Sequence, residues 1–200
     1  MLLSDTPGSS TLPPPFSHYP LDRAYDEMFG ANSKPHPAYK KLYYRLLEMP
    51  LETLQQRQQA ADVTLMNQGI TFTVYGGSEG TERVWPYDLL PRIINAEEWA
   101  TIEKGLTQRI IALDHFLKDI YHDERILSDG VVPRWLVYSC RHMRREMRGF
   151  RVPHDRYITI IGSDLVRLPN GQFAVLEDNL RVPSGVSYML NNRRVMKRTF

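Results

Sequence analysis

A Pro169-Asn170-Gly171 turn near the end of this 200-residue chain restricts the local fold more than any other feature of the sequence. Apolar and polar residues alternate on both sides of the turn. Asn-Gly between two such runs is the strongest local signal for a β-hairpin. We therefore predict two antiparallel strands here, over Tyr157–Leu168 and Gln172–Asn179.

The length of the loop decides which side chains face each other across this hairpin. If Asn170 and Gly171 alone form the loop, Asp164 lies directly opposite Glu177. A three-residue loop, in which a type I turn is followed by a left-handed glycine, would place the two carboxylates on opposite faces. We prefer the two-residue loop because it pairs valine with valine and leucine with phenylalanine on one face.

Two facing carboxylates and a nearby amide predict a metal site at one end of the hairpin. Carboxylates that face each other across a strand pair repel, and a divalent cation between Asp164 and Glu177 would turn that repulsion into binding. Asn179 adds a neutral oxygen on the same face, and ligands that are all oxygen suit Mg²⁺ bound together with substrate phosphates. The alternative is an ordinary solvated hairpin end. Asp178 would point to the other face and pair with an arginine.

Charge is distributed unevenly along the chain, although the net charge is only +2. Residues 141–200 hold twelve Lys and Arg against five Asp and Glu, a net charge of +7, which leaves −5 for residues 1–140. A basic segment with clustered acids suits a polyanion bridged by a metal, such as a nucleoside triphosphate. Nucleic acid is the competing partner, and we favour it less because no nucleic-acid-binding motif accompanies the charge.

Several arginines cluster in a stretch that we predict to be helical, Pro133–Arg148. On a helix, Arg141, Arg144, Arg145 and Arg148 would lie along one face. That face is either a solvated, ion-paired surface or a patch that contacts the triphosphate. Under the second interpretation, Arg144 and Arg145 are candidate nucleotide-binding residues.

The chain divides into three segments by composition and pattern. Residues 1–20 are rich in Ser, Thr and Pro and predict a disordered tail. Residues 21–76 predict a helical lead-in that is interrupted at Pro50. Residues 77–200 hold a long amphipathic helix that begins near Asn95, then the hairpin, then a helix after Ser184. Helices together with an antiparallel hairpin indicate a mixed α/β fold of the α+β class.

The composition also restricts where the protein works. A single cysteine, Cys140, excludes an internal disulfide framework and fits a reducing compartment. We find neither a secretory signal nor a run of roughly 20 apolar residues, so we expect a cytoplasmic protein without a membrane partner. The last residues look like the interior of a helix, which predicts that the chain is a fragment of something longer.

The hairpin and the loop after it resemble the metal hairpin of ATP-grasp ligases. In that superfamily an Asp on one strand and a Glu-x-Asn on the next hold the Mg²⁺ ions that bridge the ATP phosphates. The matching stretches here are Ser-Asp-Leu-Val (163–166), Leu-Glu-Asp-Asn (176–179) and Pro-Ser-Gly (183–185). Residues 162–193 more closely resemble the circularly permuted ATP-grasp proteins, relatives of glutathionylspermidine synthase. Weaker likeness around 25–28 and 75–94 extends the resemblance over residues 21–200.

The resemblance implies an ATP-grasp-like, circularly permuted fold and ATP-dependent ligation through an acyl phosphate that an amine captures. It assigns Mg²⁺ to Asp164, Glu177 and Asn179, and it makes Arg181 a phosphate or substrate contact with a catalytic role. In permuted members, the strands with the ATP-clamping lysines follow the hairpin. This chain stops before them, so we expect an incomplete domain over 77–200.

Three functional hypotheses follow from these observations. The first is a portion of a Mg²⁺/ATP-dependent carboxylate–amine ligase that acts on small-molecule or peptide substrates, with oligomer formation left open. The second is a non-catalytic fragment or interaction module that retains the fold. The third, which we favour least, is a basic nucleic-acid-binding module.

Overall fold

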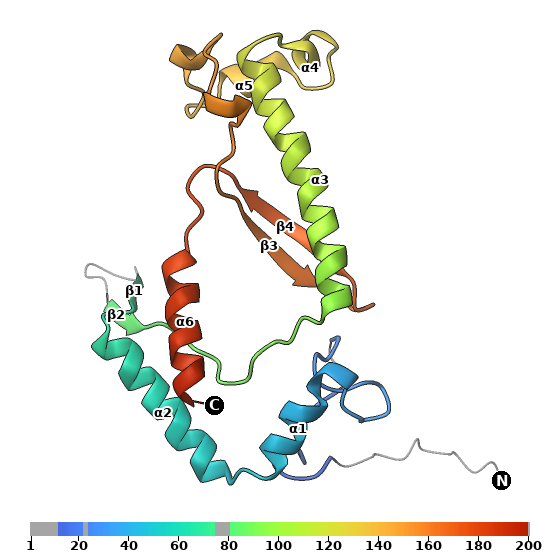
Figure 1. Ribbon diagram of the computed structural model, residues 1–200, viewed down its shortest axis with the longest axis vertical. Helices are drawn as coiled ribbons and strands as arrows, with labels where there is room; N and C mark the ends of the chain where they lie inside the picture. Colours follow the sequence, from blue (N-terminus) through green and yellow to red (C-terminus); the bar gives the residue numbers. More distant parts are fainter. Residues whose placement is uncertain (1–11, 22–23, 75–80, 200) are drawn as a thin grey trace, which may run out of the picture. The chain divides into compact units, whose positions relative to one another are not determined.

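The computed structural model describes residues 12–21, 24–74 and 81–199. Helices and two small two-stranded sheets give an α+β fold, as predicted (Figure 1). The chain forms two compact units, and each unit combines segments that are far apart in the sequence. Unit 1 comprises residues 1–95, 167–172 and 185–200, and unit 2 comprises residues 96–166 and 173–184.

Unit 1 contains the helices predicted on both sides of Pro50. The 3-10 helix η1 spans Pro37–Tyr39, and the α-helices α1 and α2 span Lys40–Leu47 and Leu51–Asn67. The helices separate at Pro50 because proline lacks the N–H that would continue α1 and disfavours helical geometry in the residue before it. Gly69 follows α2 with φ +66°, a left-handed helix ending that favours glycine.

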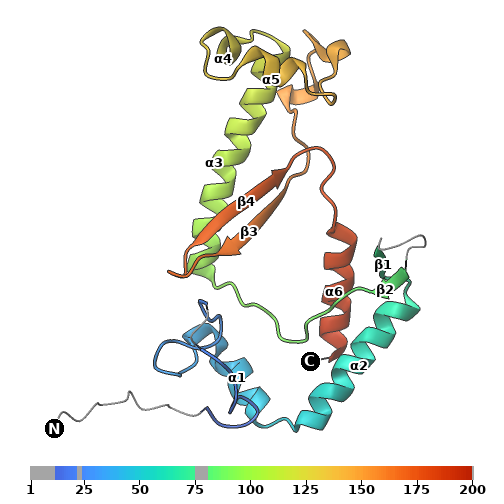
Figure 2. The ribbon, with the colours of Figure 1, turned by 180° about the vertical axis from the view of Figure 1, so that it is seen from behind.

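A small sheet and the C-terminal helix complete the main core of unit 1. Strands β1 (Thr71–Val74) and β2 (Thr81–Val84) pair antiparallel. Helix α6 (Val186–Thr199) lies beside α2 in both views (Figures 1 and 2). Val195 of α6 is buried against α2 and the residue that precedes β1, in a cluster that consists of Ala61, Leu65, Ile70 and Val195.

A second apolar cluster in unit 1 includes part of the predicted tail. Leu12 and Phe16 pack with Phe29 and Tyr43, and the Phe16 and Tyr43 rings stack with 5.8 Å between their centroids. Residues 1–11 of that tail lie outside the described residues. The packing of Leu12 and Phe16 therefore describes only the C-terminal part of the predicted tail.

Unit 2 is built on the long helix predicted after Asn95. Helix α3 spans Ala96–Tyr121, and the short helix α4 (Arg125–Ser128) follows it. Strands β3 (Gly162–Arg167) and β4 (Phe173–Asn179) lie beside α3 in both views (Figures 1 and 2). None of the helices in the described part of the chain is long and apolar enough to cross a membrane.

The helix predicted over Pro133–Arg148 is wrong, because only its beginning is helical. Helix α5 spans Arg134–Tyr138, and the later residues form turns and the 3-10 helices η2 (Arg145–Met147) and η3 (Pro153–Asp155). Tyr121 at the end of α3 holds this segment: its carbonyl accepts from the Gly149 N–H at 2.8 Å, and its hydroxyl accepts from the Arg144 N–H at 3.2 Å. These tertiary contacts outweigh local helix propensity.

The hairpin forms around the predicted turn, but its first strand begins at Gly162 rather than Tyr157, and its loop has three residues rather than two. The Gly171 N–H donates to the Leu168 carbonyl at 2.9 Å, and the Leu168 N–H donates to the Gln172 carbonyl at 2.8 Å. A two-residue type I′ loop would need positive φ at Asn170, which is absent from the described non-glycine residues with that geometry. Instead Pro169 presets a type I turn and Gly171 follows with φ +82°.

Candidate functional site

The base of the hairpin has the pairing in which Asp164 lies opposite Glu177. The Ser163 hydroxyl donates to Oδ1 of Asp178 at 2.7 Å. A Cβ added at Gly162 would lie 3.8 Å from Cβ of Asn179. Because facing residues alternate between the two faces of a strand pair, these two contacts put 164 and 177 opposite each other.

The tip and the base of the hairpin therefore differ in register by one residue, and β4 holds the extra residue. Leu176 is 70% exposed and is followed by Glu177, which is also exposed, so the in-and-out alternation of β4 is interrupted there. We infer a β-bulge at Leu176–Glu177. Such bulges bend a strand and redirect a side chain, and they recur beside functional sites.

One face of the hairpin base carries all three predicted metal ligands. Asp164, Glu177 and Asn179 are exposed, and the Asn179 amide donates to Oε1 of Glu177 at 2.9 Å. Within the described residues, no cationic side chain pairs with Asp164 or Glu177. This arrangement leaves two carboxylates and one amide oxygen directed to the same side without a counter-charge from the protein.

Asp178 lies on the opposite face and pairs with an arginine, as predicted. Its carboxylate accepts from Nη2 of Arg109 on α3 at 2.6 Å and from the Ser163 hydroxyl, and its side chain is only 7% exposed. The hydrogen bond from Ser163 and then the charge and hydrogen bond of Arg109 hold the pKa of Asp178 below its usual value. Asp178 therefore fixes the hairpin to α3, whereas Asp164 and Glu177 have no cationic partner among the described residues.

The loop after β4 folds back onto the start of β3. A Cβ at Gly162 would approach Cβ of Pro183 to 2.9 Å, so only glycine fits under the proline ring. Arg181 lies between Asn179 and this contact and is exposed. Its guanidinium makes no ion pair within the described residues, which keeps it available for an anion.

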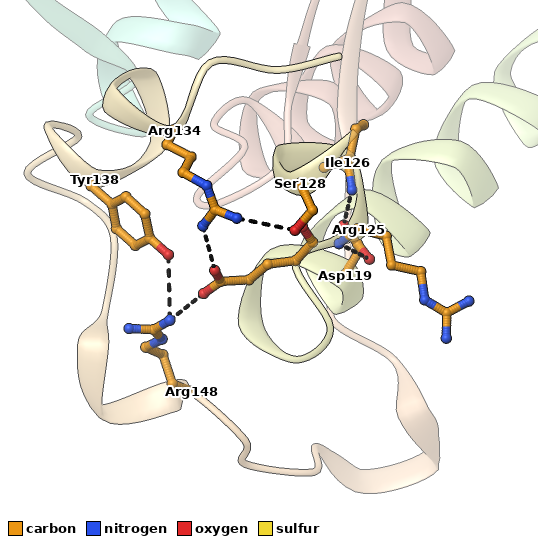
Figure 3. A network of polar contacts seen from close by, with 8 residues as sticks. Asp119, Arg125, Ile126, Ser128, Arg134, Tyr138 and Arg148 are labelled. Carbon is orange, nitrogen blue, oxygen red and sulfur yellow. Dashed lines mark hydrogen bonds and ion pairs between the residues drawn. The ribbon is translucent and has the colours of Figure 1, made fainter. Parts of the chain in front are cut away.

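Arg144 and Arg145 do not share a helix face with Arg141 and Arg148, so that prediction is wrong. The helix ends before them because of the contacts to Tyr121 described above. Arg144 and Arg145 are exposed, and Arg148 (labelled in Figure 3) instead pairs with Glu124, the N-cap residue of α4. The structure therefore separates the predicted cluster into individual side chains.

A polar network separate from the hairpin base converges on Glu124. Its side chain is 13% exposed and pairs with Arg134 at 3.2 Å and with Arg148. Both arginines are labelled in Figure 3. Hydrogen bonding by the Tyr138 hydroxyl and by both arginines lowers the pKa of Glu124. The network ties α5 and the end of η2 to the start of α4, which is a structural role, and the sequence pattern gave no signal for it.

The donor atoms at the hairpin base fit a hard cation that shares its coordination with a substrate. Among the described residues there is no group of three or more His, Cys, Asp or Glu that could enclose a metal. Two carboxylates with one amide is the kind of partial, all-oxygen set with which proteins hold Mg²⁺ when phosphates and water complete the shell. The ligand chemistry therefore suits Mg²⁺ and excludes a closed Cys or His site.

Comparison with known sequences places the chain in a family. The family described as circularly permuted ATP-grasp type 2 matches residues 91–200, which is more than half of the chain. The chain belongs to the circularly permuted ATP-grasp type 2 family. The matched region contains α3, both strands of the hairpin and α6, so the circularly permuted ATP-grasp resemblance predicted from the motifs is confirmed.

Three curated proteins similar to this ATP-grasp family member are longer than the chain. An uncharacterized Synechocystis protein is 47% identical over 88% of this chain and 37% of its own length. An uncharacterized Mycobacterium tuberculosis protein is 47% identical over 88% of this chain and 31% of its own length. A Frankia alni protein with a provisional name as a glutamate–cysteine ligase is 40% identical over 86% of this chain and 20% of its own length. The chain thus spans 20–37% of these relatives.

Proposed function

We propose that this chain supplies the metal-binding portion of a Mg²⁺/ATP-dependent carboxylate–amine ligase, with Asp164, Glu177 and Asn179 as the metal ligands. The observation that supports this proposal is the contrast between the two faces of the hairpin base. Asp178 is neutralised by Arg109, whereas Asp164 and Glu177 face the other way with no cation paired to either among the described residues. Unpaired carboxylates side by side repel unless an ion lies between them.

The proposed reaction joins an acid to an amine in two balanced steps. A substrate carboxylate attacks the γ-phosphorus of ATP and releases ADP, and the amine then attacks the acyl phosphate and releases phosphate. Bound Mg²⁺ would neutralise the phosphate oxygens during transfer. The role of Asp164, Glu177 and Asn179 is to position that charge, and the fixed Ser163–Asp178–Arg109 contacts hold their strands in place.

Arginines are the candidate phosphate contacts in this proposal. Arg181 follows the ligand Asn179 by two residues and is exposed, so we assign it to a phosphate or substrate oxygen. Arg144 and Arg145 remain candidate nucleotide contacts as individual side chains. Family membership and the provisional ligase name of a relative support ligation, and we take residues 77–200 as the ATP-grasp portion after a helical lead-in at 21–76.

Titration of Mg²⁺ against Glu177→Gln tests the proposal. We expect the change to weaken Mg²⁺ binding by about tenfold or more, which corresponds to ~1.4 kcal/mol, because it removes one anionic ligand. Isothermal titration calorimetry measures the affinity with Mg²⁺ alone and again with ATP present. The free energy of unfolding should stay constant or rise, since the change relieves repulsion between two exposed carboxylates.

Glu103→Gln is the matched control, because Glu103 is an exposed glutamate of unit 2 on α3. It should leave Mg²⁺ binding unchanged. Equal Mg²⁺ affinity for Glu177→Gln and the unaltered protein would refute the metal role and favour the non-catalytic module. Binding to a nucleic acid duplex that weakens steeply with salt and ignores Mg²⁺ would instead favour the basic nucleic-acid-binding module.

A further inference from the structure

A polar hollow in unit 2 lies outside the hairpin site. It has a volume of about 620 Å³, within the range of small-molecule sites. The C-terminal half of α3, the start of α4 and the segment through η3 line it. The charged and imidazole side chains on which the argument depends are His115, Lys118, His122, Arg125, Arg151 and Asp155.

The acidic residues around this hollow already have partners. Lys118 pairs with Asp155, and Arg125 pairs with Asp123 at 3.0 Å. Asp119 uses both carboxylate oxygens on the first backbone N–H groups of α4, at 3.0 and 2.9 Å. Each carboxylate at the wall is therefore compensated by a cation or by two amide donors.

Arg151 is the cation of the hollow that has no such partner. Within the described residues it makes neither an ion pair nor a hydrogen bond, and its side chain is exposed. The hydrogen bond and the charge of Lys118, followed by the charge of Arg151, lower the pKa of Asp155, which is consistent with the place of all three at one hollow. A guanidinium is weakly hydrated and offers parallel donors that match a carboxylate or a phosphate.

The neighbours of Arg151 add hydrogen-bond donors rather than apolar surface. His115 and Lys118 lie one turn apart on the same face of α3, and His122, in the turn directly after the helix, lines the same hollow. The His122 ring is already 2.6 Å from the Tyr157 hydroxyl, which orients it. A wall of guanidinium, ammonium and imidazole groups suits a compact oxyanion and gives little to an apolar ligand.

We propose that this hollow binds a small molecule through its oxyanion, a carboxylate or a phosphate, with Arg151 as the principal contact. Asp155 competes with the ligand for Lys118, and its negative charge opposes the approach of an anion to Arg151. The proposal does not depend on Mg²⁺ or on the hairpin carboxylates.

Three variants test the site with inorganic phosphate and succinate as probes, titrated at constant ionic strength without Mg²⁺. Arg151→Gln should weaken binding of the preferred probe by about tenfold, ~1.4 kcal/mol. Asp155→Asn should strengthen binding several-fold, because it frees Lys118 and removes a negative charge from the wall of the hollow. Asn also tolerates the left-handed geometry of this position, where φ is 57°. Preference for phosphate or for succinate identifies the oxyanion.

Arg156→Gln is the matched control, since Arg156 is exposed and does not line the hollow. It should bind both probes like the unaltered protein, and chemical-shift changes on probe addition should centre on His115 and Arg151. The proposal is overturned if neither probe binds saturably, if Arg156→Gln weakens binding as much as Arg151→Gln, or if Asp155→Asn fails to strengthen it. None of these outcomes bears on Mg²⁺ binding by Glu177.

Discussion

Gly171 combines two requirements that only glycine meets. Its φ of +82° lies in the left-handed region, and a Cβ there would come within 2.8 Å of Cε2 of Tyr25. Gly69 meets the first requirement alone, because its φ is +66° and nothing lies within 4 Å of an added Cβ. The two positions therefore separate backbone strain from steric overlap.

Gly171→Ala should destabilise the protein more than Gly69→Ala does. We expect a cost of about 1–2 kcal/mol for each from the left-handed backbone. Overlap with the Tyr25 ring should add about 1–3 kcal/mol at position 171. Denaturant midpoints at unchanged m-value measure both.

Gly105 provides the control of opposite sign, since it lies inside α3 with open space around it. Gly105→Ala should stabilise the protein by about 0.5–1 kcal/mol. Equal losses of stability for Gly69→Ala and Gly171→Ala would show that the Tyr25 ring moves away from the added methyl group. The predicted steric overlap with Tyr25 would then be wrong.

At the scale of elements, Asp114 joins α3 to the segment that leads into β3. It is 8% exposed, and one oxygen, Oδ1, accepts the backbone N–H groups of Tyr157 and Ile158 at 2.8 and 2.9 Å. Neither donor belongs to a strand or helix, so Asp114 replaces the partner that regular structure would supply. The anchor positions β3 with its metal-ligand candidate Asp164.

Asp114→Ala should lose about 2–4 kcal/mol of stability, because two partly buried N–H groups would be left without an acceptor. Asp114→Asn keeps an acceptor oxygen and should lose less than half as much. Hydrogen exchange at Tyr157 and Ile158 should accelerate in the Ala variant. Asp129→Ala is the exposed control and should be neutral; similar losses for Ala and Asn at position 114 would contradict the anchoring role.

Elements with a strong local signal could be predicted from the sequence, and elements fixed by distant contacts could not. The long periodic pattern after Asn95 gave α3, whereas the helix expected over Pro133–Arg148 yielded to contacts with Tyr121. The sequence predicted that Asp178 pairs with an arginine, but it did not identify Arg109 as that arginine. The two lie 69 residues apart, and no periodicity in a single sequence links positions so distant.

At the scale of the whole molecule, the two units do not correspond to consecutive halves of the chain. Unit 1 takes in residues 167–172 and 185–200 as well as the first 95 residues. Arg167 reaches across 140 residues to pair with Glu27 at 2.9 Å, and Arg167 is only 10% exposed. The core of unit 1 therefore requires α6 as well as the first 95 residues.

Val195→Ala tests this dependence, because Val195 on α6 is 2% exposed and packs with Ala61 and Leu65 of α2. Removing two methyl groups from that cluster should cost about 1–3 kcal/mol. Hydrogen exchange should accelerate first at amides of α2, although α2 ends more than a hundred residues before α6 begins. Val182→Ala, at a side chain 73% exposed, is the control and should leave exchange unchanged. Faster exchange confined to α6 would mean that α2 holds its structure alone, and unit 1 would then not be a single cooperative core.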